Sequence, residues 1–352
     1  MRTVNVKAST QYDVLIGAGL LRDAGWWIKS AAGGDLAVVV TDDIVAKLYL
    51  SRTVASLTGA GYKTVVFEIP NGEASKTAQN YIKLLDFMAE AGVTRSDVVV
   101  ALGGGVVGDL AGFAAATYMR GIPYAQIPTT LLAAVDSSVG GKTAIDLDAG
   151  KNLAGAFYQP KIVICDYDLF KTLPERVFAD GCAEVAKYAM IADGDLFNML
   201  GEPQLDLEEI ITRCVTIKRD VVCEDEFDTG ARNLLNFGHT VGHAVEKLSD
   251  FAISHGEAVA IGMVVETRAA VFAGLCGSER LETLLQTLKK CGLPTKSPYG
   301  AAELADAALS DKKRRGGVIT LIFPSGETGC VLTQTKVEEL ERIFAAGLEG
   351  GV

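Results

Sequence analysis

The stretch that decides the fold is DVVVALGGGVVGD, which runs from Asp97 to Asp109. Residues 97–102 have the length and mostly apolar composition of a buried strand, and three glycines follow directly. Beyond the glycines the sequence reads as the opening of a helix. Such a turn lets the backbone approach a pyrophosphate, whose charge is favoured by the helix N-terminus. The spacing is not GxGxxG, and a turn that is merely tight is the alternative interpretation.

The chain on both sides of this turn alternates between strands and helices as far as Leu173. Strands are expected at residues 2–8, 12–17, 35–40 and 63–69, and helices at 44–58 and 77–91. This rhythm predicts a parallel α/β sheet. Asn71-Gly72-Glu73 and Thr129-Thr130 also follow strands, at the edge where open parallel sheets bind ligands. Together with the glycine turn they favour a dinucleotide site.

From Glu175 onward the pattern becomes mainly helical, with one expected strand or hairpin arm at residues 317–323. Helices are expected at 178–192, 207–222, 239–248, 256–273, 278–291 and 337–346. We therefore predict two domains: residues 1–173 as an α/β domain with a Rossmann-like parallel sheet, and residues 174–352 as a mainly α-helical domain. The cleft between two such domains is the default ligand site.

Composition limits the class of protein. The 352 residues are 49% hydrophobic and carry a net charge of −11, which argues against nucleic acid or an anionic membrane surface as partner. The seven cysteines include no CxxC pair and are typical of a reduced, cytosolic protein. The N-terminus lacks the apolar core of a signal peptide, and no apolar run is long enough to span a membrane. We expect a cytoplasmic protein.

All three histidines lie within seventeen residues, at positions 239, 243 and 255. His239 and His243 share one helix face, and His255 is far enough along for a returning element to bring it back. A catalytic zinc takes three protein ligands. The sequence thus favours a metal site, with a carboxylate as third ligand, over buried, hydrogen-bonded helix histidines.

Several cations also stand out in this acidic chain. Lys142 and Lys151 lie in glycine-rich, loop-like sequence, a poor place for a charge that only interacts with solvent. They could bind an anion such as a phosphorylated acid. Glu184 and Lys187 share a helix face, either as a local ion pair or with Glu184 as the missing metal ligand.

Ordered motifs then extend over the chain. They are Asn71-Gly72-Glu73-x-x-Lys76, Gly103–Asp109, Tyr118-Met119-Arg120-Gly121, Pro128–Leu132, Asp136–Lys142, Gly150-Lys151-Asn152, Ala183–Tyr188, Arg232–His243 and His255-Gly256-Glu257. With these motifs the chain resembles the 3-dehydroquinate synthase family over essentially its full length. The segment 146–149 departs from the family pattern and leaves the geometry of that loop open.

The resemblance implies an NAD- and zinc-dependent cyclase, with Co²⁺ as an alternative metal. Its substrate would be 3-deoxy-D-arabino-heptulosonate 7-phosphate, and its products 3-dehydroquinate and phosphate. NAD would take the C5 hydride, phosphate would leave by elimination, and the hydride would return before ring opening and an intramolecular aldol closure. A homodimer fits the family, with Arg120 reaching over from a second subunit.

The same resemblance implies the site residues. Glu184, His239 and His255 would bind the metal, and His243 would lie beside it in a hydrogen-bond or proton-relay role. Catalytic roles would fall to His243, Lys142, Lys187, Arg232 and Asn236. Substrate would contact Arg120, Asp136, Lys142, Asn152, Lys187, Lys218, Arg232, Asn236 and Lys312, with Arg120, Lys142, Asn152 and Lys312 at the phosphate. The cofactor would contact Asp42, Glu73, Lys76, Gly104, Gly105, Val106, Asp109, Thr129, Thr130, Lys142, Lys151, Thr172 and Leu173.

Three alternatives remain at this stage. A sister sugar-phosphate cyclase would act on sedoheptulose 7-phosphate or glucose 6-phosphate, although Asn236 and the Lys312-Lys313 pair favour the heptulosonate. A metal-dependent polyol dehydrogenase would release reduced cofactor and does not require the cluster of cations. A non-catalytic NAD-binding or regulatory protein would not require the metal ligands.

Overall fold

The computed structural model describes residues 1–309 and 317–348. The chain divides into two compact units. The first unit consists of residues 1–173 and 207–227, and the second of residues 174–206 and 228–352. The sequence analysis places residues 207–222 in the helical domain, whereas the structure groups this helix with the first unit. The reason is that its apolar face, which includes Ile211 and Val215, packs on the β1–β2 hairpin.

The first unit is built on a seven-stranded sheet in the order β1-β2-β9-β6-β5-β3-β4. Only the β1–β2 pair is antiparallel within this sheet. The strands are β1 (Arg2–Lys7), β2 (Gln11–Gly17), β3 (Leu36–Asp42), β4 (Lys63–Ile69), β5 (Val98–Gly103), β6 (Tyr124–Pro128) and β9 (Ile162–Asp166). The predicted parallel α/β sheet is confirmed. Central strands β3 and β5 are buried along their whole length, as expected of a parallel sheet covered on both faces.

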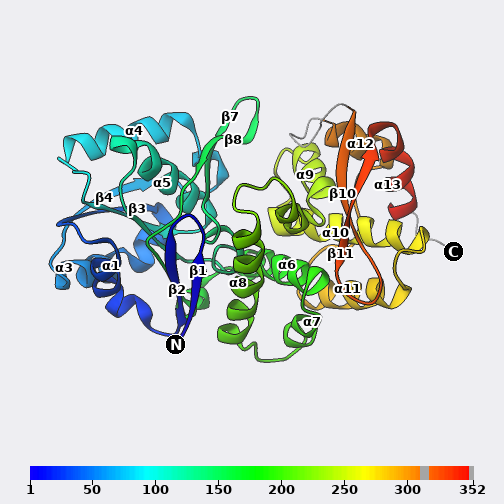
Figure 1. Cartoon of the computed structure of the whole chain (residues 1–352), viewed down its shortest axis with the longest axis horizontal. Helices are drawn as coiled ribbons and strands as arrows, with labels where there is room; N and C mark the ends of the chain where they lie inside the picture. Colours follow the sequence, from blue (N-terminus) through cyan, green and yellow to red (C-terminus); the bar gives the residue numbers. More distant parts are fainter. Residues whose placement is uncertain (310–316, 349–352) are drawn as a thin grey trace. The chain divides into compact units, whose positions relative to one another are not determined.

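Helices cover both faces of this sheet, with α4 and α5 on one side and α1 and α3 on the other (Figure 1). They are α1 (Ala24–Ala32), α2 (Asp43–Val45), α3 (Ser51–Gly59), α4 (Ala78–Glu90), α5 (Gly105–Thr117) and α8 (Leu207–Glu224). A π-helical segment, η2 (Ala46–Leu50), joins α2 to α3, so the predicted helix at 44–58 is continuous. The core under α4 and α5 includes Leu84, Met88 and Leu110.

A separate antiparallel hairpin follows β6 within the first unit. It pairs β7 (Lys142–Leu147) with β8 (Gly150–Phe157). The loop-like interpretation of Lys142 and Lys151 is therefore wrong, because both lie on strands. Another glycine permits close strand pairing in this hairpin: a Cβ on Gly155 would stand 2.1 Å from the Thr143 carbonyl oxygen.

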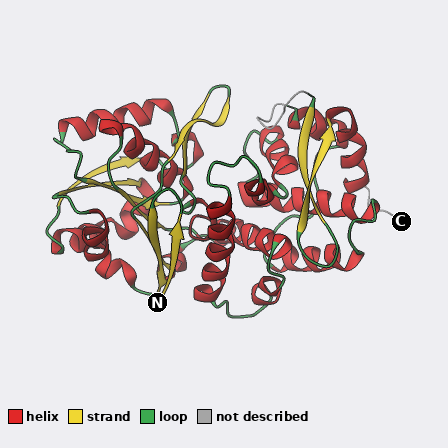
Figure 2. Ribbon diagram, in the orientation of Figure 1, coloured by secondary structure: helices red, strands yellow, loops and turns green. Residues whose placement is uncertain are grey.

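The second unit is mainly helical, with one antiparallel hairpin of β10 (Val318–Pro324) and β11 (Cys330–Lys336), drawn in yellow in Figure 2. Its helices are α6 (Glu175–Ile191), α7 (Asp195–Leu200), α9 (His239–Leu248), α10 (His255–Phe272), α11 (Ser278–Lys290), α12 (Ala301–Ala308) and α13 (Leu340–Leu348). Helix α10 is buried along most of its length, and Ile261 and Val265 pack with Phe344 in one core. Among the helices of the described ranges, none combines the length and apolar character that crossing a bilayer would require.

Candidate active site

The glycine turn lies where the order of strands reverses. The chain passes from β3 to the edge strand β4 and then returns to the other side of β3 as β5. In open parallel sheets, ligands bind outside the carboxyl ends of strands at such a point. Asp42 ends β3, where its side chain accepts hydrogen bonds from two backbone N–H groups of α2. Gly103 ends β5, and Gly104 is the N-cap of α5.

The N-terminus of α5 is kept open by small residues. A Cβ on Gly104 would stand 3.3 Å from Thr130 Cγ2, and one on Gly105 would stand 3.1 Å from Ser137 Oγ. Thr129 donates its backbone N–H to the Gly103 carbonyl (3.0 Å), and its hydroxyl is buried with no protein hydrogen-bond partner among the described residues. Backbone N–H groups and a spare hydroxyl at a helix N-terminus suit the phosphates of a dinucleotide.

Charged residues predicted to contact the cofactor form one cluster beside this turn. Lys76 Nζ lies 2.8 Å from Glu73 Oε1 and 3.2 Å from Asp109 Oδ2, and Lys151 Nζ lies 3.8 Å from Glu73 Oε1. Burial raises the pKa of Asp109 to about 6 despite the attraction of Lys76. Burial would lower the pKa of Lys76, but Asp109 and Glu73 outweigh it and raise that pKa. The cluster therefore links the α5 start to the β7–β8 hairpin.

The sequence analysis missed one member of this cluster, Asp146. Its Oδ1 lies 3.9 Å from Lys76 Nζ and accepts the Asn152 backbone N–H at 2.8 Å. Asp146 belongs to the segment that departs from the family pattern, so no motif marked it. The structure places this segment at the turn of the hairpin, and Asn152, which has a φ of 53°, follows on β8.

The remaining predicted cofactor residues lie in four places of the first unit. Val106 is in the first turn of α5, Thr130 follows β6, and Lys142 is the exposed first residue of β7. Thr172 ends the 3-10 segment η6 (Tyr167–Thr172) with Leu173 after it, and its hydroxyl is hydrogen-bonded to Tyr49.

Two of the predicted substrate residues of this unit contact each other. Lys218 on α8 donates to the Asp136 carbonyl at 2.7 Å and forms an ion pair with the Asp136 carboxylate. Arg120 is exposed and has a φ of 66° at the end of η4 (Tyr118–Arg120). This left-handed backbone is uncommon outside glycine and often marks a functional position.

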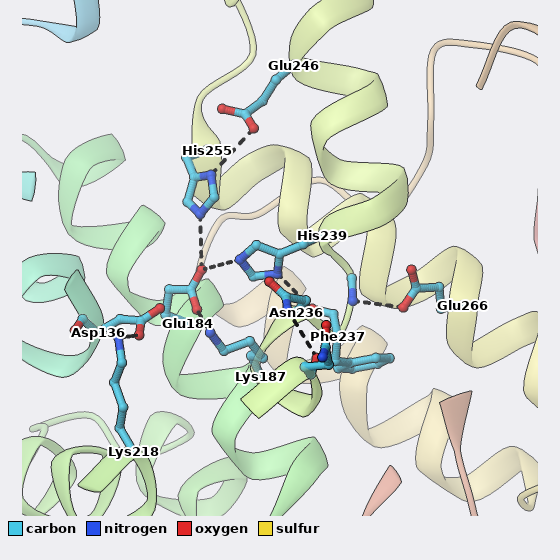
Figure 3. Close-up of polar contacts among 12 residues, drawn as sticks. Asp136, Glu184, Lys187, Lys218, Asn236, Phe237, His239, Glu246, His255 and Glu266 are labelled. Atoms are coloured by element: carbon cyan, nitrogen blue, oxygen red, sulfur yellow. Dashed lines mark hydrogen bonds and ion pairs between the residues drawn. The ribbon is translucent and has the colours of Figure 1, made fainter. Parts of the chain in front are cut away.

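In the second unit, local packing fixes the start of α9. Gly238, its N-cap, has a φ of 78°, and a Cβ there would stand 2.6 Å from Met263 Cγ on α10. Its backbone N–H donates to the buried Glu266 carboxylate at 2.8 Å (Figure 3). Only glycine satisfies both the backbone conformation and the close approach. This contact fixes the position of His239, the next residue, against α10.

The predicted metal ligands converge on one carboxylate oxygen. Glu184 Oε1 on α6 lies 3.2 Å from His255 Nε2 and 3.6 Å from His239 Nε2 (Figure 3). Ligand atoms of these three residues all lie within 4.8 Å of one another. His239 Nδ1 lies 3.0 Å from the Phe237 carbonyl oxygen, which leaves Nε2 for the metal. One carboxylate and two imidazoles are a donor set of catalytic zinc, and the residues fit the ion.

The electrostatics of this site are those of a buried charge cluster. Glu184 is fully buried and forms an ion pair with Lys187, one turn along α6. Burial would lower the pKa of His255, but hydrogen bonds to Glu184 and Glu246 outweigh it and raise that pKa to about 10. The carboxylates of Glu184 and Glu246, on either side of the His255 ring, thus favour positive charge at this position.

The other site residues predicted in the second unit lie on neighbouring elements. His243 is one turn after His239 on α9, and its ring centroid lies 5.5 Å from that of His239 and 6.3 Å from that of His255. Arg232 is 1% exposed in the 3-10 segment η7 (Ala231–Asn236), and Asn236 ends that segment. Lys312 lies outside the described residues.

The sequence analysis also missed two buried carboxylates of this unit, Glu246 and Glu266. Both contact the histidine segment across helices. Glu246 is three residues after His243 and was visible as part of the same helix face, whereas no spacing linked Glu266 to Gly238.

Comparisons with known proteins agree with this geometry. Residues 66–180 match the profile of the family 3-dehydroquinate synthase N-terminal, and residues 181–314 that of 3-dehydroquinate synthase C-terminal. A relative, the 3-dehydroquinate synthase of Pelobacter propionicus, is 43% identical over 99% of each chain.

Two solved structures share the fold over nearly the whole chain. A 2-deoxy-scyllo-inosose synthase complexed with carbaglucose-6-phosphate, NAD⁺ and Co²⁺ is 26% identical, with a TM-score of 0.89 over 99% of this chain and 100% of the other. The 2-epi-5-epi-valiolone synthase of Streptomyces hygroscopicus, with NAD⁺ and Zn²⁺ bound, is 28% identical, with a TM-score of 0.88 over 99% and 98%. By its two matched profiles and its full-length relative, this chain belongs to the 3-dehydroquinate synthase family.

Proposed function

We propose that this protein is a 3-dehydroquinate synthase, which converts 3-deoxy-D-arabino-heptulosonate 7-phosphate into 3-dehydroquinate and phosphate. The observation that carries the proposal is the convergence of His239 Nε2 and His255 Nε2 on Glu184 Oε1 in a member of this family. The relative at 43% identity favours this reaction over that of the sister cyclases, whose structures are 26% and 28% identical.

Glu184, His239 and His255 would hold the divalent cation, which supplies Lewis-acid polarisation of substrate hydroxyl groups. The turn at Gly104 and Gly105 would hold NAD, which accepts and returns a hydride in each turnover. Because the cofactor is regenerated, its site must bind it tightly. The Lys76 cluster would bind the polar parts of the cofactor beside the α5 start, with Thr129 and Thr130 as further donors.

Cationic and polar residues would bind the substrate, which has a phosphate and a carboxylate as its two acidic ends. Arg120, Lys142, Asn152 and Lys312 are proposed for the phosphate, where charge-assisted hydrogen bonds contribute roughly 1.5–3 kcal/mol each. Asp136, Lys187, Lys218, Arg232 and Asn236 are proposed for the hydroxyl and carboxylate groups. His243 would accept or return a proton at a substrate hydroxyl, because its ring lies beside both metal-binding rings. The proposal includes a cytoplasmic homodimer, in which the unit of residues 1–173 and 207–227 binds NAD and the unit of residues 174–206 and 228–352 binds the metal.

The test is an assay of phosphate release from this substrate, with and without a chelator, while the absorbance of reduced cofactor is recorded. We expect release that requires metal and catalytic NAD, without net reduced cofactor. Release from sedoheptulose 7-phosphate alone would assign a sister cyclase, and steady accumulation of reduced cofactor would assign a dehydrogenase. His255→Ala should abolish release, because it removes one of the three metal ligands.

A further inference from the structure

Glu246 lies against the side of His255 that faces away from Glu184. Its Oε2 is 3.5 Å from His255 Nδ1, whereas Glu184 Oε1 is 3.2 Å from His255 Nε2. Figure 3 shows the two carboxylates on opposite sides of the ring. Glu246 is 4% exposed, so its carboxylate has little contact with solvent. The proposed set of catalytic and metal-binding residues does not use it.

The turn between α9 and α10 creates this contact. Glu246 lies near the end of α9, and its carbonyl accepts the Phe251 backbone N–H at 2.8 Å. Asp250 and Phe251 both have positive φ, at 50° and 61°, which reverses the chain sharply. Ser254 then caps α10, whose first residue is His255. The carboxylate and the imidazole are therefore held by consecutive helices joined through a closed turn.

We propose that Glu246 is a positioning residue. It accepts a hydrogen bond from the Nδ1–H of His255 and thereby orients Nε2 toward the metal. The inference rests on the proposed metal site. A neutral imidazole carries one proton, and the group bound to one nitrogen decides which tautomer is present. A carboxylate at Nδ1 fixes the ring orientation and also makes Nε2 a stronger donor. His239 has the same arrangement with a weaker partner, since its Nδ1 faces the Phe237 carbonyl.

The alternative role for Glu246 is that of a metal ligand in its own right. His243, Glu246 and His255 also bring ligand atoms within 4.8 Å of one another. However, the two nitrogens of one imidazole point away from each other. An ion bound by His255 Nε2 with Glu184 and His239 is therefore on the wrong side of the ring for Glu246. Glu246 as a ligand would need a second ion, so metal stoichiometry separates the two roles.

The experiment compares wild type, Glu246→Gln and Glu246→Ala. Glu303→Gln is the control, because Glu303 is an exposed carboxylate of the same unit that accepts the Gly300 N–H at 2.8 Å. Zn²⁺ affinity is measured by chelator competition, the Co²⁺ proteins are compared by visible absorption, and thermal melts verify folding. The Zn²⁺-loaded proteins, labelled with ¹⁵N-histidine, are examined by NMR, where only three imidazoles contribute.

We expect one metal ion per chain and an Nδ1–H signal from His255 in wild type. Glu246→Ala should bind Zn²⁺ about 10- to 100-fold more weakly. Glu246→Gln should lose less affinity, because the glutamine amide oxygen still accepts the hydrogen bond from Nδ1–H. The Co²⁺ spectrum of this variant should nevertheless shift. Glu303→Gln should match wild type in all readouts.

Wild-type affinity and an unchanged Co²⁺ spectrum in both folded Glu246 variants would overturn the inference while leaving the metal site intact. A second bound ion that is lost in these variants would overturn it in favour of a ligand role. Wild type that binds no metal would remove the proposed site itself.

Discussion

Lys187 and Glu184 form an ion pair in which the two side chains are 1% and 0% exposed, one helical turn apart on α6. A charge removed from water this completely depends on its partner, because the protein interior screens and solvates it poorly. The same carboxylate also faces two imidazoles. Lys187 therefore helps to hold the carboxylate of the proposed metal ligand in place.

Replacing Lys187 should lower the stability of the folded protein, apart from any effect on the reaction. Lys187→Met leaves a buried carboxylate without its ammonium partner and should lower the unfolding free energy of the metal-free protein by about 3–5 kcal/mol. Added Zn²⁺ should recover part of the loss, since a cation again neutralises Glu184. Urea unfolding with and without Zn²⁺ measures both effects. Lys171→Met is the control, because Lys171 pairs with Asp168 at the same spacing but is 75% exposed. Equal losses in the two variants would contradict the prediction.

Asp109 makes the stability of the first unit depend on pH. The pKa of its carboxyl is raised by burial from 3.8 to about 6. Since the folded pKa exceeds the unfolded one, the stability that this group contributes is fully present below about pH 4 and is lost as pH rises through about 6.

Asp109→Asn should therefore be more stable than wild type near pH 7.5, and this gain should disappear near about pH 4. Urea unfolding of both proteins across that range is the measurement. Asp148→Asn, which makes the same carboxylate-to-amide change on the exposed β7–β8 turn, is the control. A gain that is the same at every pH would refute the assignment of this titration to Asp109.

Lys142 should matter for turnover and little for folding. It is the exposed first residue of β7, so Lys142→Ala should change stability by no more than about 0.5 kcal/mol. Loss of charge-assisted hydrogen bonds to substrate should lower the rate of phosphate release by about 100-fold or more. Lys63→Ala, at the equally exposed first position of β4, provides the matched control. Full activity of folded Lys142→Ala would remove Lys142 from the substrate site.

The sequence predicted those parts of the site whose residues are close in the chain. The strand, glycines and helix of residues 97–109 form one local unit, and their periodicity specified it. His239 and His243 share a face because a helix repeats every 3.6 residues. For Glu184 the sequence left open an ion pair with Lys187 or a metal-ligand role, and the resemblance to the family favoured the ligand role. Helix α6 brings this carboxylate to both imidazoles.

The sequence did not predict the contacts that are set by tertiary packing. Glu246 contacts His255 because Asp250 and Phe251 adopt positive φ, and neither residue type specifies that backbone conformation. Lys142 and Lys151 lie on strands although glycines surround them, because β7 and β8 pair with each other, and Gly155 on β8 lets the two backbones approach closely. Helix α8 looked like its helical neighbours, and only its apolar face against β1 and β2 shows that it belongs to the first unit.

A substitution in the glycine turn gives the sharpest test of the cofactor site, because it adds side-chain volume without changing any charge. Gly104 has a φ of −77°, which any residue adopts, so alanine there meets no backbone strain. Its Cβ would press on Thr130 Cγ2 at 3.3 Å and cover the N–H groups that begin α5. Gly104→Ala should therefore fold normally and bind NAD about tenfold more weakly, a loss of about 1.4 kcal/mol.

Fluorescence titration with NADH measures the affinity, and urea unfolding measures stability. Gly59→Ala is the matched control, since a Cβ there meets nothing within 4 Å at the end of α3. Both variants should remain as stable as wild type within about 1 kcal/mol. Gly59 lies in α3, where alanine is the better helix former, and at the Gly104 N-cap the preference for glycine over alanine is no more than about 1 kcal/mol. Only Gly104→Ala should lose affinity. If NADH binds both variants equally well, the phosphates are not held at the start of α5, and the dinucleotide site must be sought elsewhere in the first unit.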